Sequence, residues 1–172
     1  VQNSPQVVGE LVHIFRFEKQ TVLVMVNIVG NAVDAGSDNR LPHDRRLTVF
    51  PLQDVQAQLR ARGLDGWLLY DFRGANVLAQ RVLHIRADAH ASRRFFYFVP
   101  AQGAPRKLVH RIESGALDHV PGEATVYLAW QELERGIGQL LEGSGRIAME
   151  YSPRCANPYI SRVDAGTIEL VR

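Results

Sequence analysis

The pattern of apolar and polar positions changes character near residue 46. Residues 1–46 hold one run rich in β-branched residues at 21–26, which predicts one or two strands, and then a polar stretch at 31–39 that predicts a loop. From residue 47 onward, helix-type and strand-type patterns alternate between glycine and proline breaks. We therefore predict an extension of unassigned role at 1–46 and one domain at 47–172.

Four segments of this domain predict helices. The first begins at Pro51 and ends before Gly63, because proline suits the first turn of a helix and glycine its end. The last segment places Tyr159, Val163 and Leu170 on one stripe. The predicted helices span about 51–62, 76–83, 131–141 and 157–172.

Apolar runs between these helices predict strands. The run at 66–70 is nearly all apolar, which is typical of a strand covered on both faces. The runs at 94–100 and 106–110 flank a short turn with glycine and proline and predict a hairpin. Further strands are expected at 125–129 and 146–150. The alternation predicts an α/β fold with a mixed, mainly parallel sheet, one hairpin, and helices on both faces.

Composition and charge exclude several classes of protein. The chain of 172 residues is 46% hydrophobic and 22% charged, which is typical of a folded domain and not of a disordered chain. No stretch reaches the roughly 20 apolar residues of a membrane span. The formal charge is only +2, and the arginines are scattered, so we expect no nucleic-acid partner and no membrane partner. With Cys155 as the only cysteine and no signal-like start, we expect a cytoplasmic location.

Signals for catalysis by this chain are weak. His84, Asp88 and His90 supply donor types that suit a divalent cation, but their spacing matches no known ligand pattern. A polar surface loop explains them as well. Cys155 matches no catalytic signature, and we expect an inert, partly buried thiol. We predict no catalytic residue and no metal ligand in this chain.

The segment 71–76 has the character of a site. It follows the predicted strand at 66–70, at the end of the sheet where open α/β folds form their crevices. Asn76 can cap the next helix, while Asp71 and Arg73 can direct a charge pair toward a ligand or a partner. A capped turn with a surface ion pair explains the same residues equally well.

Five stretches of the domain resemble the amino-terminal domain of the creatinase and Xaa-Pro peptidase family, which includes aminopeptidase P and prolidase. They occur in the family's order, and the last is the most specific. One departure is Asn76-Val77, where the family has Asn-Pro, and residues 1–46 match nothing in the family. The stretches are GLDGWLLYDFRG at 63–74, RRFFYFVP at 93–100, VYLAWQEL at 126–133, AMEYSP at 148–153 and PYISRVDAGTIELVR at 158–172.

The resemblance implies a protein of two domains. In this family a mixed-sheet amino-terminal domain precedes a catalytic domain that binds two divalent metal ions (manganese, zinc or cobalt) through two aspartates, one histidine and two glutamates. The amino-terminal domain helps to form a dimer and narrows the access of proline-containing peptides to the catalytic cleft. The chain would then be a truncated, non-catalytic part of an Xaa-Pro aminopeptidase or dipeptidase.

The same resemblance implies three partners, which are the catalytic domain, a second copy of the protein, and proline-containing peptides. Two alternatives stay open: a freestanding interaction module with this fold, and a small metal-binding enzyme that uses His84, Asp88 and His90. The residues expected nearest the cleft or the dimer interface are Asp71, Phe72, Arg73, Asn76, Arg93 and Arg94.

Overall fold

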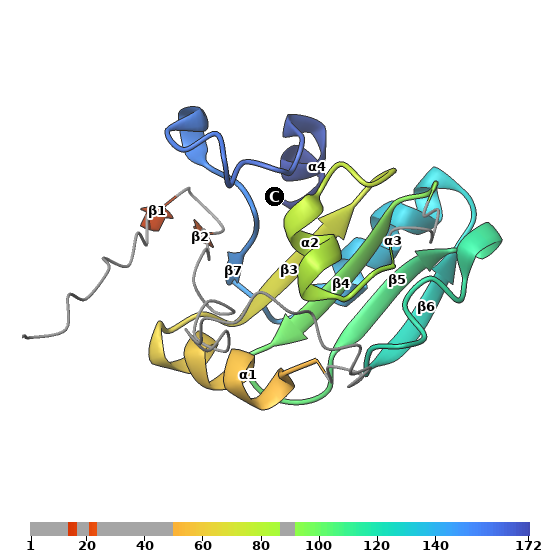
Figure 1. Ribbon diagram of the computed structural model, residues 1–172, viewed down its shortest axis with the longest axis horizontal. Helices are drawn as coiled ribbons and strands as arrows, with labels where there is room; N and C mark the ends of the chain where they lie inside the picture. Colours follow the sequence, from red (N-terminus) through yellow and green to blue (C-terminus); the bar gives the residue numbers. More distant parts are fainter. Residues whose placement is uncertain (1–13, 17–20, 24–49, 87–91) are drawn as a thin grey trace, which may run out of the picture.

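The computed structural model describes residues 14–16, 21–23, 50–86 and 92–172. Their strands form one seven-stranded sheet in the order β1-β2-β7-β3-β4-β5-β6 (Figure 1). The strands are β1 (Ile14–Arg16), β2 (Thr21–Leu23), β3 (Gly66–Asp71), β4 (Phe95–Pro100), β5 (Arg106–His110), β6 (Glu123–Tyr127) and β7 (Arg146–Ala148).

The sheet is mixed, as predicted. The pairs β1-β2, β3-β4 and β4-β5 are antiparallel, and the pairs β2-β7, β3-β7 and β5-β6 are parallel. Among the described strands the two kinds are equally numerous, so parallel pairing is less dominant than the sequence predicted. The hairpin predicted between 94 and 110 is the β4-β5 pair.

The β3-β4 pair is antiparallel, and the helix between the two strands is short. This helix, α2 (Val77–Val82), has six residues and is therefore about 9 Å long. A strand of six residues such as β3 is about 20 Å long, so α2 does not carry the chain back to the start of β3. In the sheet, β4 begins beside the end of β3, with Phe95 opposite Asp71.

Helices cover both faces of the sheet, as predicted. Helices α1 (Leu52–Ala61) and α2 lie on one face, and α3 (Trp130–Leu140) and α4 (Ala165–Val171) lie on the other (Figure 1). Short 3-10 helices occur at Arg111–Glu113 and Pro153–Cys155.

Successive residues of β3 build the two cores in turn, because side chains of a strand alternate between the faces of a sheet. Trp67 and Leu69 pack with α1 and α2, whereas Leu68 and Tyr70 pack with α3 and α4. All six residues of β3 are buried. The nearly continuous apolar run of this strand is therefore explained by its place between two helical layers.

The last helix is shorter than predicted. It begins at Ala165, and Asp164 caps it by accepting a hydrogen bond from the Thr167 N–H at 2.8 Å. The residues before Asp164 do not make helical hydrogen bonds, because the N–H groups of Arg162 and Val163 both donate to the Glu150 carbonyl. The predicted apolar stripe of Tyr159, Val163 and Leu170 is wrong at Tyr159, because the side chain of this residue is 80% exposed.

The strand predicted at 125–129 lies two residues earlier, as β6. Its register with β5 runs from Arg106 opposite Glu123 to His110 opposite Tyr127. Ala129 is already the N-cap of α3, so the chain leaves the sheet before that residue.

Of the predicted extension, the structure describes β1 and β2, and β2 pairs with β7. The loop predicted at 31–39 lies outside the described residues. In the part of the chain that the structure describes, no helix has the length and apolar character needed to cross a membrane.

Two glycines of α3 allow a matched test of the packing between this helix and the sheet. A Cβ on buried Gly136 would lie 2.7 Å from Leu108 Cδ1, whereas a Cβ on exposed Gly138 would meet nothing within 4 Å. Overpacking a core costs about 1–3 kcal/mol, and alanine gains about 1 kcal/mol over glycine in a helix. We expect G136A to lower the free energy of unfolding by about 1 kcal/mol and G138A to raise it by up to about 1 kcal/mol. Urea denaturation measures both, and shifts of the same sign would contradict the packing described here.

Candidate functional site

The turn after β3 is closed by the buried carboxylate of Asp71. Its Oδ2 accepts a hydrogen bond from the Gly74 N–H at 2.9 Å, and its Oδ1 accepts one from the Asn76 N–H at 2.7 Å. The side chain is fully buried. Arg73, at a φ of 56°, is exposed. In this turn the Asp71 carboxylate therefore points inward, and Arg73 is the charged side chain that faces the solvent.

Asn76 links the turn to three parts of the fold. Its Oδ1 accepts the Ala79 N–H at 3.0 Å, which confirms the predicted cap of α2. Its Nδ2 donates to the Tyr70 carbonyl at 2.7 Å and to Glu150 Oε2 at 2.9 Å. The side chain is fully buried. Asn76 is thus part of the framework beneath the site.

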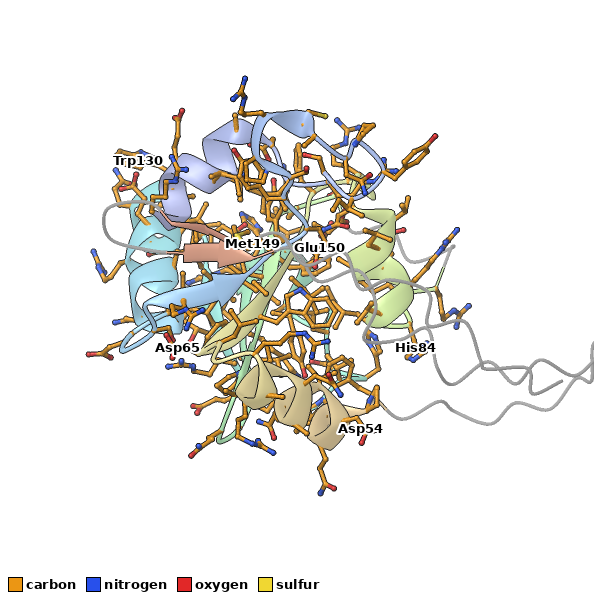
Figure 2. All side chains as sticks on the ribbon, turned by 90° about the vertical axis from the view of Figure 1, so that its left-hand side faces the viewer. Asp54, Asp65, His84, Trp130, Met149 and Glu150 are labelled. Carbon is orange, nitrogen blue, oxygen red and sulfur yellow. The ribbon has the colours of Figure 1, made fainter. Side chains whose placement is uncertain are left out.

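Glu150 is a buried carboxylic acid at the centre of the molecule (Figure 2). Its Oε1 accepts a hydrogen bond from Trp67 Nε1 at 2.6 Å. Burial raises the pKa of Glu150 to about 7, although the hydrogen bonds from Asn76 and Trp67 act in the opposite direction. This network was not found from the sequence, where Glu150 closes an apolar run and was expected to end a strand.

A pocket of about 540 Å³ lies at the carboxyl end of β3, on the face covered by α3 and α4. It is formed where the end of β3, the start of β4 and the first turns of both helices meet. The lining residues are Tyr70, Phe72, Arg94, Trp130, Leu133, Glu134, Asp164, Gly166, Thr167 and Leu170.

A hydrogen-bonded group forms the polar floor of this pocket. Asp164 Oδ2 accepts hydrogen bonds from the Tyr70 hydroxyl at 3.0 Å and from Thr167 Oγ1 at 2.8 Å. Burial raises the pKa of Tyr70 to about 12. Burial also acts to raise the pKa of Asp164, but the hydrogen bonds from Thr167 and Tyr70 outweigh it and hold that pKa below its ordinary value. At neutral pH the floor therefore holds a neutral phenol and a carboxylate.

The walls of the pocket carry groups that are free to meet a ligand. Arg94 and Glu134 are exposed, and neither side chain makes a hydrogen bond or ion pair with another residue of the described segments. Phe72 is 40% exposed and Trp130 is 64% exposed. With the Asp164 carboxylate of the floor, the arrangement offers one positive charge, two negative charges and two aromatic surfaces around a single hollow.

The structure divides the six candidate residues into three groups. Phe72 and Arg94 line the pocket, and both lie at the end of the β3-β4 pair where Asp71 is opposite Phe95. Arg73 and Arg93 are exposed outside its lining. Asp71 and Asn76 are buried beneath the turn.

Sequence reasoning missed the contribution of α3 and α4 to this pocket. Trp130, Glu134, Asp164 and Thr167 all come from the first turns of these helices or from their caps. Trp130, Asp164 and Thr167 do fall within the stretches that carry the family resemblance, which was the available signal. Their convergence depends on how the helices cross the sheet, and no local pattern reports that.

No group of three or more histidine, cysteine, aspartate or glutamate side chains in the described part of the chain is placed to hold a metal ion. The hypothesis based on His84, Asp88 and His90 is not tested, since Asp88 and His90 lie outside the described residues. Cys155 is exposed, contrary to the expectation of a partly buried thiol.

Comparison with known proteins gives a likeness in structure only. No protein-family model and no curated protein matches the sequence. The structure is similar to the creatinase/prolidase N-terminal domain of an X-Pro dipeptidase from Streptococcus pyogenes, with a TM-score of 0.52 and 17% identity. That match covers 70% of this chain and 83% of the other.

Two further solved structures show lower TM-scores. A proline dipeptidase from Streptococcus pneumoniae is 25% identical at a TM-score of 0.44, over 59% of this chain and 73% of that one. The prolidase from Pyrococcus horikoshii is 14% identical at a TM-score of 0.46, over 70% of this chain. The match spans only 28% of that prolidase. The chain therefore has the fold of the creatinase/prolidase amino-terminal domain, which confirms the resemblance seen in its sequence.

Proposed function

We propose that this chain is the non-catalytic amino-terminal domain of an Xaa-Pro metallopeptidase of the aminopeptidase P or prolidase type. Its role would be to shape substrate access and dimerisation for a carboxyl-terminal domain that binds the two metal ions. The observation that carries this proposal is the match to 83% of a solved creatinase/prolidase N-terminal domain. The five sequence stretches in the family's order support it.

The pocket at the end of β3 is the surface that we assign to substrate access. A short peptide carries a carboxylate that Arg94 can bind and an ammonium group that Glu134 can bind, through charge-assisted hydrogen bonds. Phe72 and Trp130 offer aromatic surface against an apolar ring such as that of proline. The pocket therefore suits a short zwitterionic peptide better than a folded protein.

Hydrolysis would require the metal ions of the other domain, where they would activate water and polarise the peptide carbonyl. Nothing in the described part of this chain fits the set of ligands that two such ions need. We also propose a cytoplasmic location, which the single cysteine supports.

The basic test measures cleavage of an Xaa-Pro dipeptide such as Ala-Pro in the presence of manganese or zinc. The 172-residue chain alone should not cleave it, and the product of a reading frame that includes a following catalytic domain should. Cleavage by the 172-residue chain would overturn the non-catalytic assignment. A longer product that leaves Xaa-Pro bonds intact would overturn the peptidase assignment.

The role of the pocket is tested by Arg94→Ala in the protein that carries both domains. A hydrogen bond to a charged group contributes about 1.5–3 kcal/mol, so kcat/KM for Ala-Pro should fall by about tenfold or more. The melting temperature should not change, because the exposed guanidinium bonds to no other described residue.

Arg135→Ala is the matched control for this variant. Arg135 is an exposed arginine of α3 that does not line the pocket. If Arg94→Ala turned over Ala-Pro at the wild-type rate, or if both variants lost the same activity, the assignment of the pocket to substrate access would be wrong.

A further inference from the structure

Within the described segments, β6 is the outermost strand of the sheet, and its outer edge is unpaired. It pairs with β5 and with no other described strand, and its first four residues are exposed (Figure 1). In a parallel pair, every second residue of an edge strand directs its N–H and C=O groups away from the neighbouring strand. An edge strand of this kind is a template for pairing with another chain.

The usual protection of sheet edges is largely missing from β6. Natural edge strands carry lysine, proline or a bulge that discourages pairing. The register of β6 with β5 is unbroken over its five residues, which include no proline and a single charged side chain, Glu123. Val126 is 45% exposed although it belongs to a strand. We take this edge to be an interaction surface.

We propose that β6 pairs in antiparallel fashion with β6 of a second copy of this chain, so that the two sheets join into one. This inference rests on the dimerisation part of the proposed function and gives it a location. It does not depend on the substrate or on the metal ions.

The sequence of β6 allows such pairing without a conflict. A two-fold axis perpendicular to the sheet keeps every side chain on its own face, and full overlap of the five residues places Thr125 opposite Thr125 of the second copy. Ala124 then lies opposite Val126 of the second copy on one face. Glu123 lies opposite Tyr127 of the second copy on the other face.

The charges at the two ends of β6 favour the antiparallel arrangement. Glu123 marks one end, and its carboxylate bonds to no other described residue. At the other end the Tyr127 hydroxyl donates to the Arg94 carbonyl at 2.8 Å. Burial raises the pKa of Tyr127, and three charged side chains act on the same hydroxyl. The charges of Arg94 and, less strongly, Arg93 lower this pKa, and the charge of Glu113 raises it. Glu132 also lies at this end, where its carboxylate accepts the Leu128 and Ala129 N–H groups, and the charge of Arg111 acts on it. Three arginines thus outnumber two glutamates there.

The antiparallel pairing brings the Glu123 carboxylate of one copy to this positively charged end of the other. A parallel pairing in register would place Glu123 opposite Glu123, and like charges directly opposite each other destabilise a sheet. Charge therefore selects a two-fold symmetric partner, a second copy of the chain in reversed direction.

Disulfide trapping tests the register. Cys155 is exposed, so the test uses the Cys155→Ser background. Residues directly opposite in an antiparallel pair have Cα atoms about 4.5–5.5 Å apart, which fits a disulfide. Thr125→Cys should therefore form a covalent dimer on mild oxidation, seen on a non-reducing gel at twice 19.3 kDa.

Glu123→Cys is the register control in the same background. Residue 123 of one copy is four residues away from residue 123 of the other along the shared sheet, or about 14 Å. It should remain monomeric under the same oxidation. Failure of Thr125→Cys to cross-link, or equal cross-linking of Glu123→Cys, would overturn the proposed pairing.

The second measurement is the mass in solution by sedimentation equilibrium. Thr125→Asp places two like charges opposite each other at the axis and should weaken the dimer by about tenfold or more. Gln53→Asp, which adds the same charge at an exposed position of α1, should leave the dimer intact. Dimers that Thr125→Asp does not weaken would overturn the β6 interface but leave dimerisation standing. A wild-type chain that is monomeric at every concentration would overturn both, and the peptidase assignment would still rest on its own assay.

Discussion

Replacing Asn76 with alanine is expected to lower the free energy of unfolding by about 3–7 kcal/mol. The side chain is fully buried and makes three hydrogen bonds that alanine cannot make. Loss of a helix cap costs about 1 kcal/mol. Each buried acceptor left without a partner, here the Tyr70 carbonyl and Glu150 Oε2, costs about 1–3 kcal/mol more. Domains of this size are stable by only about 5–15 kcal/mol, so the variant should be close to unfolding at body temperature.

Urea denaturation followed by tryptophan fluorescence measures this loss, since Trp67 is buried and bonded to the same carboxylate. Asn157→Ala is the matched control. The Asn157 side chain accepts one hydrogen bond, from the Tyr159 N–H at 3.1 Å in an exposed turn, and its loss should cost less than about 1 kcal/mol. Equal losses in the two variants would show that the buried connections of Asn76 contribute nothing beyond a local turn.

The parts of the fold that the sequence predicted well are those with local causes. Pro51 and Gly63 mark the ends of α1, where Gly63 has a φ of 61° that glycine adopts without strain. The apolar run of β3 and the turn between β4 and β5 also depend on neighbouring residues only. Such signals are contained within about ten residues of chain, so a pattern reports them.

The parts that escaped prediction depend on partners far away in the sequence. Trp67 and Glu150 are 83 residues apart, and Tyr70 and Asp164 are 94 apart. The start of α4 was missed because the backbone N–H groups of Arg162 and Val163 donate to the Glu150 carbonyl rather than to carbonyls one helical turn back. A charge inside an apolar run was the only local sign of the buried acid.

The candidate site was predicted in outline for a related reason. The end of β3 was the correct end of the sheet, because a strand-to-helix turn there is visible in the sequence. The roles of individual residues were not visible. The sequence left Asp71 either facing a ligand or a partner or closing a capped turn, and its carboxylate accepts two backbone N–H groups inside the turn. The pocket takes its acidic groups from Glu134 and Asp164 of the helical layer instead.

The protonation of the buried Glu150 makes the stability of the structure beneath the pocket depend on pH. Glu150 joins β7 to β3 through Trp67 and to α2 through Asn76. The turn between β3 and α2, which Asn76 closes, also places Phe72 in the wall of the pocket. Any change in the protonation of Glu150 therefore acts on the framework that positions the wall of the pocket.

The free energy of unfolding should fall as pH rises from about 4.5 to about 7 because of this one group. Its pKa is about 7 in the folded chain and 4.5 in the reference state, so between these values the folded state holds a proton that the unfolded state has released. The stabilising contribution is complete below pH 4.5, decreases by about 1.4 kcal/mol per pH unit, and is lost above pH 7. The total change is about 3 kcal/mol.

Glu150→Gln isolates this contribution, because glutamine does not titrate. Urea denaturation of both proteins across pH 4–8 gives a difference, wild type minus variant, that should decrease through the interval and then level off. The same substitution at exposed Glu134, which lies on the pocket wall outside the buried network, serves as the control and should not reproduce that decrease. A difference that stays constant from pH 4.5 to 7 would mean that water solvates the Glu150 carboxylate in the folded chain. The connection between β7, β3 and α2 described here would then be broken in solution, and the turn beneath the pocket would need another support.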